Sequence, residues 1–227
     1  MGAKEHEANI SHYERRYREG YGLVYPDGHV IRFHRHILEY ELSMTGGNVL
    51  DYGCGTGSHL HYFENNGYTP YGCDISETAI EKCKSLLPRY AENFHVVPAV
   101  PRLRDNFSET FDLIFANQVL YFLNDEGICD LVAQFHEVAA DGAVFFATMM
   151  APTNYFFRNV VSASDGGLSK VVLKGRLNQT SYVNFKTQDQ VLDLFRPFEK
   201  LHLGSYSHTI REDEGPTDHF IYVGRKS

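Results

Sequence analysis

A glycine-rich turn is the part of this sequence best suited to binding a ligand. Glycine occupies every second position from Gly53 to Gly57, and the apolar run around Val49 and Leu50 comes directly before it. Because glycine has no Cβ, such a turn lets the backbone approach a bound molecule closely. Open parallel sheets bind their ligands at the carboxyl ends of their strands. The turn is therefore expected to form one wall of a ligand cleft.

The spacing of these glycines argues against a dinucleotide. A dinucleotide-binding turn has the pattern G-x-G-x-x-G, which seats a pyrophosphate at the start of the following helix. Counted from Gly53, the third required glycine falls on Ser58, and counted from Gly55 it falls on Leu60. Asp74 ends the next predicted strand, where a carboxylate can accept hydrogen bonds from both hydroxyls of a ribose. Together the turn and Asp74 favour a nucleoside as the ligand.

Candidates for acid–base chemistry lie near the same predicted edge. His29 stands in a Pro-Asp-Gly-His turn, Tyr121 follows the fourth predicted strand, and His208 ends the next-to-last one. An oxygen or nitrogen nucleophile can require a general base, and each of these side chains could serve as one. The chain has 12 histidines, so the residue type alone decides little. A surface role for each residue, and a reaction without a base, both stay open.

The elements that must position these side chains alternate between strands and helices. Apolar residues recur at three- and four-residue steps in the predicted helices, and Ser76 is placed to cap one of them. Such an alternation is typical of a parallel sheet that helices cover on both faces. The predicted strands cover residues 48–52, 69–73, 94–97, 111–116 and 143–148, and the predicted helices cover 29–42, 58–65, 76–87 and 128–139.

The alternation of predicted strands and helices ends at residue 148. A hairpin is predicted with arms at 170–173 and 181–185. Thr187 and Gln190 then have the spacing of a capping box, which predicts the start of a short helix. Two strand-like runs close the chain, at 201–206 and 220–223.

Tyrosines at four-residue steps mark the N-terminal segment. On a helix they would form one aromatic stripe. Packing against the body of the protein is one interpretation, and a lid that brings Tyr21 to the ligand is the other. Gly20 is expected to end the helix. The four residues are Tyr13, Tyr17, Tyr21 and Tyr25.

The composition argues against several classes of protein. The 29 acidic and 21 basic residues give a net charge of -8, whereas proteins that coat nucleic acid usually have the opposite balance. No apolar run is long enough to span a bilayer, and the N-terminus lacks the apolar stretch of an export signal. The four cysteines are far apart and form no C-x-x-C pair, which argues against a zinc or redox motif. We therefore expect a cytoplasmic protein that binds neither metal nor membrane, and nucleic acid is an unlikely partner.

These motifs resemble those of the class I S-adenosylmethionine-dependent methyltransferases. Val49–Gly57 resembles the first motif of that family, Asp74 its second acidic position, Phe111–Asn117 its fourth-strand motif, and His219–Lys226 its final strand. The resemblance implies an α/β Rossmann-like three-layer sandwich, with a seven-stranded, mostly parallel sheet and an antiparallel last strand. It also implies S-adenosyl-L-methionine as cofactor and S-adenosyl-L-homocysteine as product. No metal is implied, because the sulfonium already makes the methyl group electrophilic.

The family pattern assigns roles to residues around the cleft. It implies that Asp51 faces the methionine ammonium through water, that Asp74 holds the ribose hydroxyls and that Ile75 packs on the adenine. Asn117 would offer its backbone carbonyl to the ammonium. Many relatives have an acid after the third strand, but this chain has Pro-Ala-Val, so backbone groups there would contact the adenine. The remaining candidates for the cofactor site are Tyr21, Gly53, Cys54, Gly55, Gly57, Val100 and Gln118.

With this resemblance, we predict a single methyltransferase domain over residues 1–227. Its predicted parts are an N-terminal helical cap or lid (1–47), a cofactor-binding core (48–150), an inserted hairpin on the substrate side (151–186), and a C-terminal helix with a strand pair (187–227).

Local charge provides a hypothesis for the acceptor. Residues 151–186 contain five basic residues and a single acid, although the whole chain is acidic. In the predicted fold this segment borders the acceptor side of the cleft. We therefore predict methylation of oxygen or nitrogen on a small anionic acceptor, such as a phosphorylated metabolite, nucleotide sugar or sugar acid in surface-polysaccharide or natural-product tailoring. A solvated surface is the alternative explanation. The expected substrate-binding residues are Arg158, Lys174 and Arg176.

Two other functions stay open. Methylation of RNA or protein would use the same core, but RNA binding needs a broad basic face, and the basic residues of the N-terminal segment are interleaved with acids. No N-P-P-Y-like tetrad follows the fourth strand, which argues against a planar amine as the acceptor. A non-catalytic S-adenosylmethionine-binding module is the third candidate, although the intact turn and Asp74 argue against it. Nothing in the sequence indicates the oligomeric state.

Overall fold

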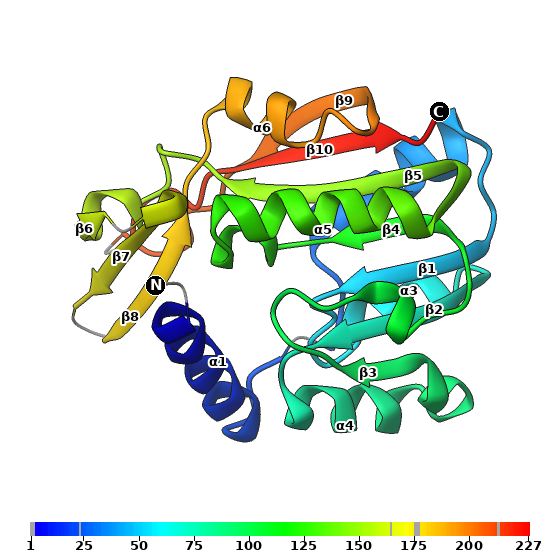
Figure 1. The fold of residues 1–227 in the computed structure, drawn as a ribbon, viewed down its shortest axis with the longest axis horizontal. Helices are drawn as coiled ribbons and strands as arrows, with labels where there is room; N and C mark the ends of the chain where they lie inside the picture. The colour runs from blue at the N-terminus through cyan, green and yellow to red at the C-terminus, as the bar shows by residue number, and fades with distance from the viewer. Residues whose placement is uncertain (1–2, 23, 164, 175–177, 213) are drawn as a thin grey trace.

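A seven-stranded sheet lies at the centre of the computed structural model, which describes residues 3–22, 24–163, 165–174, 178–212 and 214–227 (Figure 1). The strand order is β3-β2-β1-β4-β5-β10-β9, and within this sheet β10 runs opposite to the other six strands. The predicted fold class is therefore confirmed. The strands are β1 (Gly47–Tyr52), β2 (Tyr68–Asp74), β3 (Phe94–Val96), β4 (Phe111–Ala116), β5 (Ala139–Met150), β9 (Glu199–Tyr206) and β10 (His219–Arg225).

Helices cover both faces of this sheet and make the three layers. Phe33 of α2 packs on Phe146 of β5 at 4.4 Å, while Phe198 packs on Phe145, the neighbour that points to the opposite face, at 4.5 Å. The first face carries α2 (Gly28–Phe33), the π-helix η1 (His34–Glu41), α3 (Ser58–Glu64) and α4 (Glu77–Leu86), and the second face carries α5 (Asp125–Val138) and α6 (Gln188–Leu194). Short 3-10 turns lie at η2 (Pro88–Asn93), η3 (Leu103–Asp105), η4 (Leu120–Phe122), η5 (Phe157–Asn159) and η6 (Asp165–Gly167).

Local capping signals determine where two of the helices begin. The Ser76 hydroxyl accepts a hydrogen bond from the Ala79 N–H at the start of α4. Thr187 and Gln190 form a reciprocal capping box at the start of α6. Both predictions are confirmed, because a cap depends on neighbouring residues alone.

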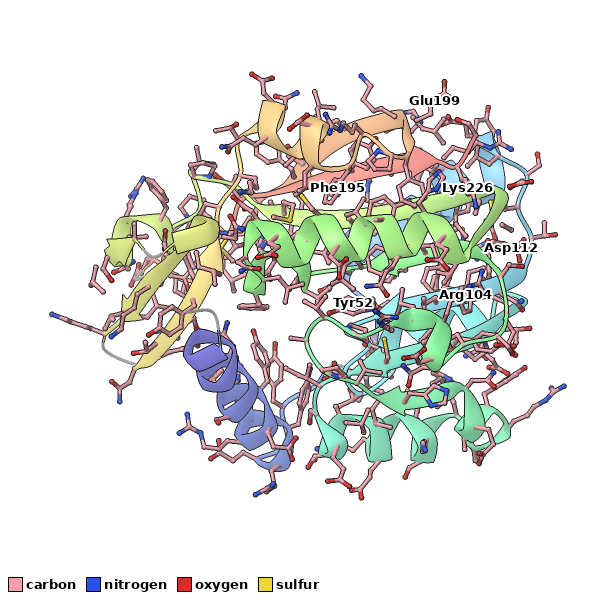
Figure 2. All side chains as sticks on the ribbon, viewed as in Figure 1. Tyr52, Arg104, Asp112, Phe195, Glu199 and Lys226 are labelled. Atoms are coloured by element: carbon pink, nitrogen blue, oxygen red, sulfur yellow. The ribbon has the colours of Figure 1, made fainter. Side chains whose placement is uncertain are left out.

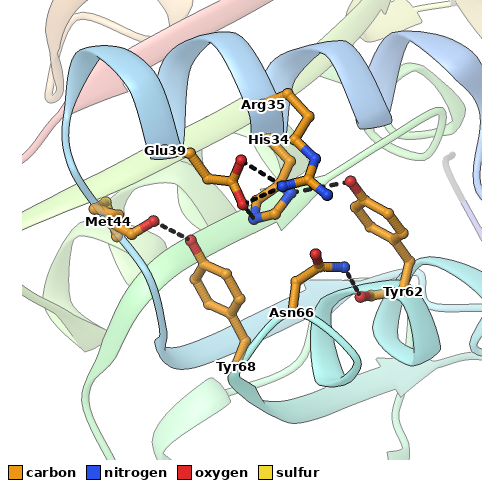
Figure 3. Close-up of polar contacts among 7 residues, drawn as sticks. All are labelled: His34, Arg35, Glu39, Met44, Tyr62, Asn66 and Tyr68. Carbon is orange, nitrogen blue, oxygen red and sulfur yellow. Dashed lines mark hydrogen bonds and ion pairs between the residues drawn. The ribbon is translucent and has the colours of Figure 1, made fainter.

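The predicted helix over residues 29–42 is present, and its second half is a π-helix. It begins as α2 and continues as η1, where the Leu42 N–H donates to the carbonyl of Ile37, five residues earlier. Figure 3 shows how η1 is held: the buried His34 lies 3.0 Å from the Tyr62 hydroxyl of α3, and Arg35 bonds Glu39 at 2.6 Å. The His34–Tyr62 contact joins the segment that carries His29 to α3, whereas the Arg35–Glu39 pair lies within η1.

The insertion after β5 forms a second, three-stranded sheet. Its strands β7 (Leu168–Leu173) and β8 (Gln179–Asn184) pair antiparallel, where the hairpin arms are predicted. A third strand, β6 (Val160–Ala163), joins β7 and was not predicted, because it is short and mostly exposed.

The first helix, α1 (Ala3–Arg18), lies between β8 and α4, opposite the carboxyl ends of the parallel strands (Figure 1). Asn9 and the backbone of Tyr182 in β8 exchange two hydrogen bonds of 3.1 and 3.2 Å. At the other end, the hydroxyls of Ser76 and Thr78 donate to the carboxylate of Glu14. Thus α1 joins the inserted sheet to the helix that follows β2.

The amino and carboxyl ends of the parallel strands carry different residues. Figure 2 shows Tyr52 and Asp112 at opposite ends of the strands. Asp112 accepts a hydrogen bond from the Asn48 N–H at the amino end of β1, whereas Tyr52 precedes the glycine-rich turn. The ligand-binding edge is therefore the one that faces α1. No helix of the described residues is long and apolar enough to cross a membrane.

Candidate active site

The glycine-rich turn between β1 and α3 has the geometry that only glycine tolerates easily. Gly53, Gly55 and Gly57 have φ values of 77°, 54° and 85°. A Cβ on Gly53 would lie 2.5 Å from a methyl group of Val119, and one on Gly55 would lie 2.9 Å from the Tyr17 hydroxyl. The turn is thus in close contact with the segment after β4 and with α1.

Asp74 ends β2 beside this turn. Its two oxygens accept hydrogen bonds of 2.9 Å from the N–H groups of Gly55 and Ser76. Burial raises the pKa of the carboxyl group, and these N–H groups partly oppose that rise. A carboxylate oxygen can accept a further hydrogen bond. Asp74 can therefore hold the turn and still accept hydroxyl groups from a ligand.

Asp51 is a buried acid without a partner for one of its oxygens. Its side chain is 1% exposed, and Oδ2 has no hydrogen-bond partner among the described residues. Burial raises the pKa of Asp51 to about 7, and His59 works against that rise. A buried carboxylate of this kind costs free energy unless a positive or hydrogen-bonding group approaches it. The site is therefore suited to a cationic ligand.

A cavity of about 100 Å³ lies between the turn, the ends of β2 and β3, and α1. This volume is small because Tyr13 and Tyr17 of α1 line it, and pockets for small molecules usually measure roughly 300–1,000 Å³. Burial raises the pKa of both tyrosines well above their ordinary value. The lining includes Asn9, Gly53, Asp74, Ile75, Val97, Ala99, Gln118, Val119 and Phe122.

Seven predicted cofactor residues lie outside this lining: Tyr21, Asp51, Cys54, Gly55, Gly57, Val100 and Asn117. Val100 packs on Gly127 of α5, and Val97 and Ala99 line the cavity in its place. Tyr21 is 44% exposed, and the guanidinium of Arg16 lies over its ring at 3.7 Å. Cys54 has a buried side chain that points to the hydrophobic core, so only its backbone belongs to the turn.

The ends of β4 and β5 carry a polar network. Asn117 Oδ1 lies 3.0 Å from His29 Nε2 and accepts a hydrogen bond of 3.3 Å from the Thr148 hydroxyl. The Asn117 amide donates to Asp27 Oδ2 at 3.2 Å. Gln118 has a φ of +57°, an uncommon backbone conformation for a residue other than glycine, and its N–H donates to Thr148 Oγ1 at 2.7 Å. Such strained positions cluster at functional sites.

The contact with Asn117 determines the tautomer of His29. Since Asn117 Oδ1 can only accept, Nε2 carries the proton and Nδ1 carries the lone pair. Nδ1 is buried and has no partner among the described residues, and burial lowers the pKa of the ring. The ring stacks on Tyr206 at 4.1 Å. His29 is therefore a neutral imidazole with a fixed tautomer at neutral pH.

Sequence reasoning missed four residues of this edge. Asp27 Oδ2 lies 3.5 Å from His59 Nε2, and this neighbour holds the pKa of Asp27 below its usual value. Tyr206 accepts a hydrogen bond of 3.0 Å from Gln118, and His219 stacks on its other face at 4.9 Å. One signal could have found His219: an antiparallel last strand begins at the edge where the parallel strands end.

The other two predicted catalytic residues are Tyr121, which is buried, and His208, which is exposed. Tyr121 is buried, with its ring 5.5 Å from that of His219, and burial raises the pKa of its hydroxyl. His208 is exposed, and its ring lies 5.4 Å from that of Tyr206.

Of the predicted substrate-binding residues, Arg158 and Lys174 are exposed on the insertion and are not in the cavity lining. Arg176 lies outside the described residues. Another basic residue of this segment, Lys186, is buried and pairs with Asp125 of α5. The positive charge of the insertion is therefore partly used for structure.

Comparison with known proteins finds similarity to methyltransferases. Residues 50–145 match the family model described as a methyltransferase domain. This match covers less than half of the chain, and over this segment the chain is similar to methyltransferases. An uncharacterized methyltransferase of Synechocystis sp. is 27% identical over 128 residues, which cover 56% of this chain and 58% of the relative. The match to this relative thus spans less than two thirds of the relative's length.

Solved structures of methyltransferases share the fold of this chain. The 1,6-didemethyltoxoflavin-N1-methyltransferase of Burkholderia thailandensis superimposes with a TM-score of 0.66 at 19% identity, over 100% of this chain and 91% of that one. The N-methyltransferase NodS of Bradyrhizobium japonicum gives a TM-score of 0.65 at 16% identity, over 96% and 98% of the two chains. Both structures contain S-adenosylhomocysteine.

Proposed function

We propose that the protein transfers the methyl group of S-adenosylmethionine to an oxygen or nitrogen of a small acceptor. The observation that carries this proposal is the pair of buried acids at one sheet edge: Asp51 has an oxygen free for a cation, and Asp74 lines a cavity beside the glycine-rich turn. S-adenosylmethionine has both a cationic amino-acid end and a ribose. The cofactor supplies an electrophilic methyl group, and the protein supplies orientation, which can account for much of the rate.

The residues fit the parts of the cofactor as follows. Asp74 accepts the ribose hydroxyls, and Ile75, Val97 and Ala99 surround the adenine. Asp51 and the backbone carbonyl of Asn117 face the ammonium group. The turn from Gly53 through Cys54 and Gly55 to Gly57 approaches the methionyl part and ribose, where a side chain would collide.

His29 is the proposed general base. Its Nδ1 lone pair takes the proton from the acceptor as the new bond to the methyl carbon forms and the bond from that carbon to sulfur breaks. Asn117 is a positioning residue, since its Oδ1 fixes the proton on Nε2 and thereby leaves Nδ1 free. Asp27 holds the Asn117 amide in the orientation that this role needs.

We further propose that the acceptor is anionic and that the reaction takes place in the cytoplasm. The exposed Arg158 and Lys174 support the first point, because they lie on the basic insertion and have room to meet an anion. Replacing Lys174 by Glu is then expected to raise the acceptor KM and to leave cofactor affinity unchanged. An unchanged KM would show that Lys174 does not bind the acceptor.

Calorimetry and product release test the proposed function. Titration with S-adenosylmethionine is expected to show one binding site, and Asp74→Asn is expected to weaken it by about tenfold or more, because charge-assisted hydrogen bonds to the ribose are lost. Asp141→Asn, at a side chain that is 96% exposed, is the matched control. S-adenosylhomocysteine release is then measured against a panel of small anionic metabolites. Absence of cofactor binding by the wild-type protein would reject the proposal.

A further inference from the structure

A groove of about 590 Å³ lies on the sheet face that carries α2 and η1, separate from the cofactor cavity. Its walls are α2 and η1 on one side and β9 and β10 on the other. The groove exists because Phe33 packs against β5, so that the helices leave the outer two strands uncovered on this face. Its floor is apolar, with Ile221 and Val223 of β10.

The polar lining of the groove consists of hydrogen-bond donors and imidazoles. It contains an exposed arginine, a serine and four histidines, and none of the described residues that line it is acidic. This is unusual for a chain with a net charge of -8. The residues are His29, Arg32, His36, His202, Ser205 and His208.

Three acids on the segments that flank this groove are bonded to other groups. Glu39 bonds Arg35 at 2.6 Å, and Glu41 bonds His202 at 2.8 Å. Asp27 accepts the amide of Asn117 on the other side of His29. Arg32 is therefore the strongest uncompensated charge facing the groove, and an arginine presents several donors to an oxyanion.

The groove continues into the proposed catalytic edge. His29 lines it and also contacts Asn117 at 3.0 Å, and Tyr206 lines it and also bonds Gln118 at 3.0 Å. A ligand in the groove therefore has its inner end beside the imidazole that the proposed function uses as base.

We propose that this groove binds the anionic end of the methyl acceptor, a carboxylate or phosphate group, with Arg32 as the main contact and His36 and His208 as further donors. The inference rests on the proposed function and moves the principal anion site from the insertion to the α2–β9 groove. Arg32 is separated from Arg35 by less than one helical turn, but only Arg32 lines the groove, while Arg35 is held by Glu39. Arg35 therefore provides a matched control.

Inorganic phosphate is the probe for this site. Imidazole signals of the histidines are followed by NMR while phosphate is added to the protein saturated with S-adenosylhomocysteine, at constant pH and ionic strength. We expect saturable shifts for His36 and His208, and a rise in the phosphate Kd of about tenfold in Arg32→Gln but not in Arg35→Gln. Shifts that do not saturate, or equal losses in the two variants, would overturn the proposal.

Cofactor affinity separates this inference from the proposed function. The S-adenosylmethionine Kd is measured by calorimetry for the same two variants and is expected to match that of the wild type. A tenfold loss of cofactor affinity in Arg32→Gln alone would assign the groove to the cofactor's own carboxylate and overturn the inference. A wild-type protein that binds phosphate in the groove but no S-adenosylmethionine would instead reject the proposed function.

Discussion

At the scale of single residues, burial determines the protonation of two groups at the carboxyl ends of the strands. Asp51 has a raised pKa of about 7, while His29 has a lowered pKa, and in both cases burial is the main cause. Both shifts favour the neutral form, because burial penalises charge. A ligand that brings the opposite charge to Asp51 therefore changes the protonation of the protein.

Binding of S-adenosylmethionine is expected to release a proton from Asp51. At pH 6 a carboxyl group with a pKa near 7 is mostly protonated, and a cationic ligand lowers that pKa. Calorimetric titrations in two buffers of different ionisation enthalpy should report the release of close to one proton per cofactor. The release should disappear in Asp51→Asn and persist in Asp141→Asn. Equal proton release by wild type and Asp51→Asn would show that Asp51 does not meet the charged end of the cofactor.

Replacing His29 by Asn is expected to lower kcat by about 10²–10⁴-fold, the usual contribution of a general base. Cofactor affinity should stay within the error of the measurement. Since the pKa of His29 is lowered, kcat/KM of the wild type should fall on the acid side only below the ordinary histidine value of 6.5. His61→Asn, a substitution at a half-buried histidine of α3 outside the cavity lining, is the control. An unchanged kcat in His29→Asn would show that His29 is not the general base.

At the scale of elements, the sequence predicts what depends on near neighbours and misses what depends on distant ones. The cap at Ser76 and the capping box at Thr187 are local, and both were predicted correctly. The change to a π-helix at His34 was missed because apolar spacing does not reveal which carbonyl an N–H selects. The groove was missed for a related reason: it arises only when η1 and β9, far apart in the sequence, lie on one face.

For the candidate site too, the sequence predicts the residues that a local motif places together and misses those that only the tertiary fold brings together. The turn and Asp74 were found because a motif places them next to one another at adjacent strands. Tyr206 and His219 were missed because only the strand order brings β9 and β10 to the same edge as β4. Val100 was named in place of Val97 and Ala99 because the path of the backbone after β3 has no local signal.

Helix α1 is expected to open when the cofactor enters. The cavity of about 100 Å³ is too small for a ligand of that size, and Glu14 holds α1 to Ser76 and Thr78. Glu14→Ala removes both hydrogen bonds and should raise the association rate of S-adenosylmethionine by about tenfold. Stopped-flow fluorescence measures the rate, and Glu19→Ala, at an exposed side chain of the same segment, is the control. An unchanged rate would mean that α1 does not gate entry.

At the scale of the whole molecule, burial of His219 links folding to pH. Nδ1 of this ring lies 2.8 Å from the Thr217 carbonyl, Nε2 is buried without a partner among the described residues, and burial lowers the pKa to about 4. Between pH 6.5 and pH 4 the unfolded chain binds a proton at this position more readily than the folded one. Stability is therefore lost as the pH falls through this range.

The expected loss from His219 is about 3 kcal/mol in the free energy of unfolding between pH 7 and pH 4. Urea denaturation at both pH values measures it, and the test is the difference between the wild type and His219→Phe. Asp51 changes stability in the opposite direction, because its pKa is raised, but it does so equally in both proteins. The variant should lose less stability than the wild type on acidification, and parallel losses would contradict the assignment.

The position of α1 also matters for anyone who labels this protein. Any fusion partner attached ahead of Ala3 emerges from the end of α1 that lies near β8 (Figure 1), and Asn9 of the same helix lines the cavity. The C-terminus lies at the far end of the sheet, where Lys226 bonds the carbonyl of Ala139 at the start of β5. An affinity tag or fluorophore after Ser227 should therefore leave the cavity undisturbed. The same group at the N-terminus would interfere with the packing of α1.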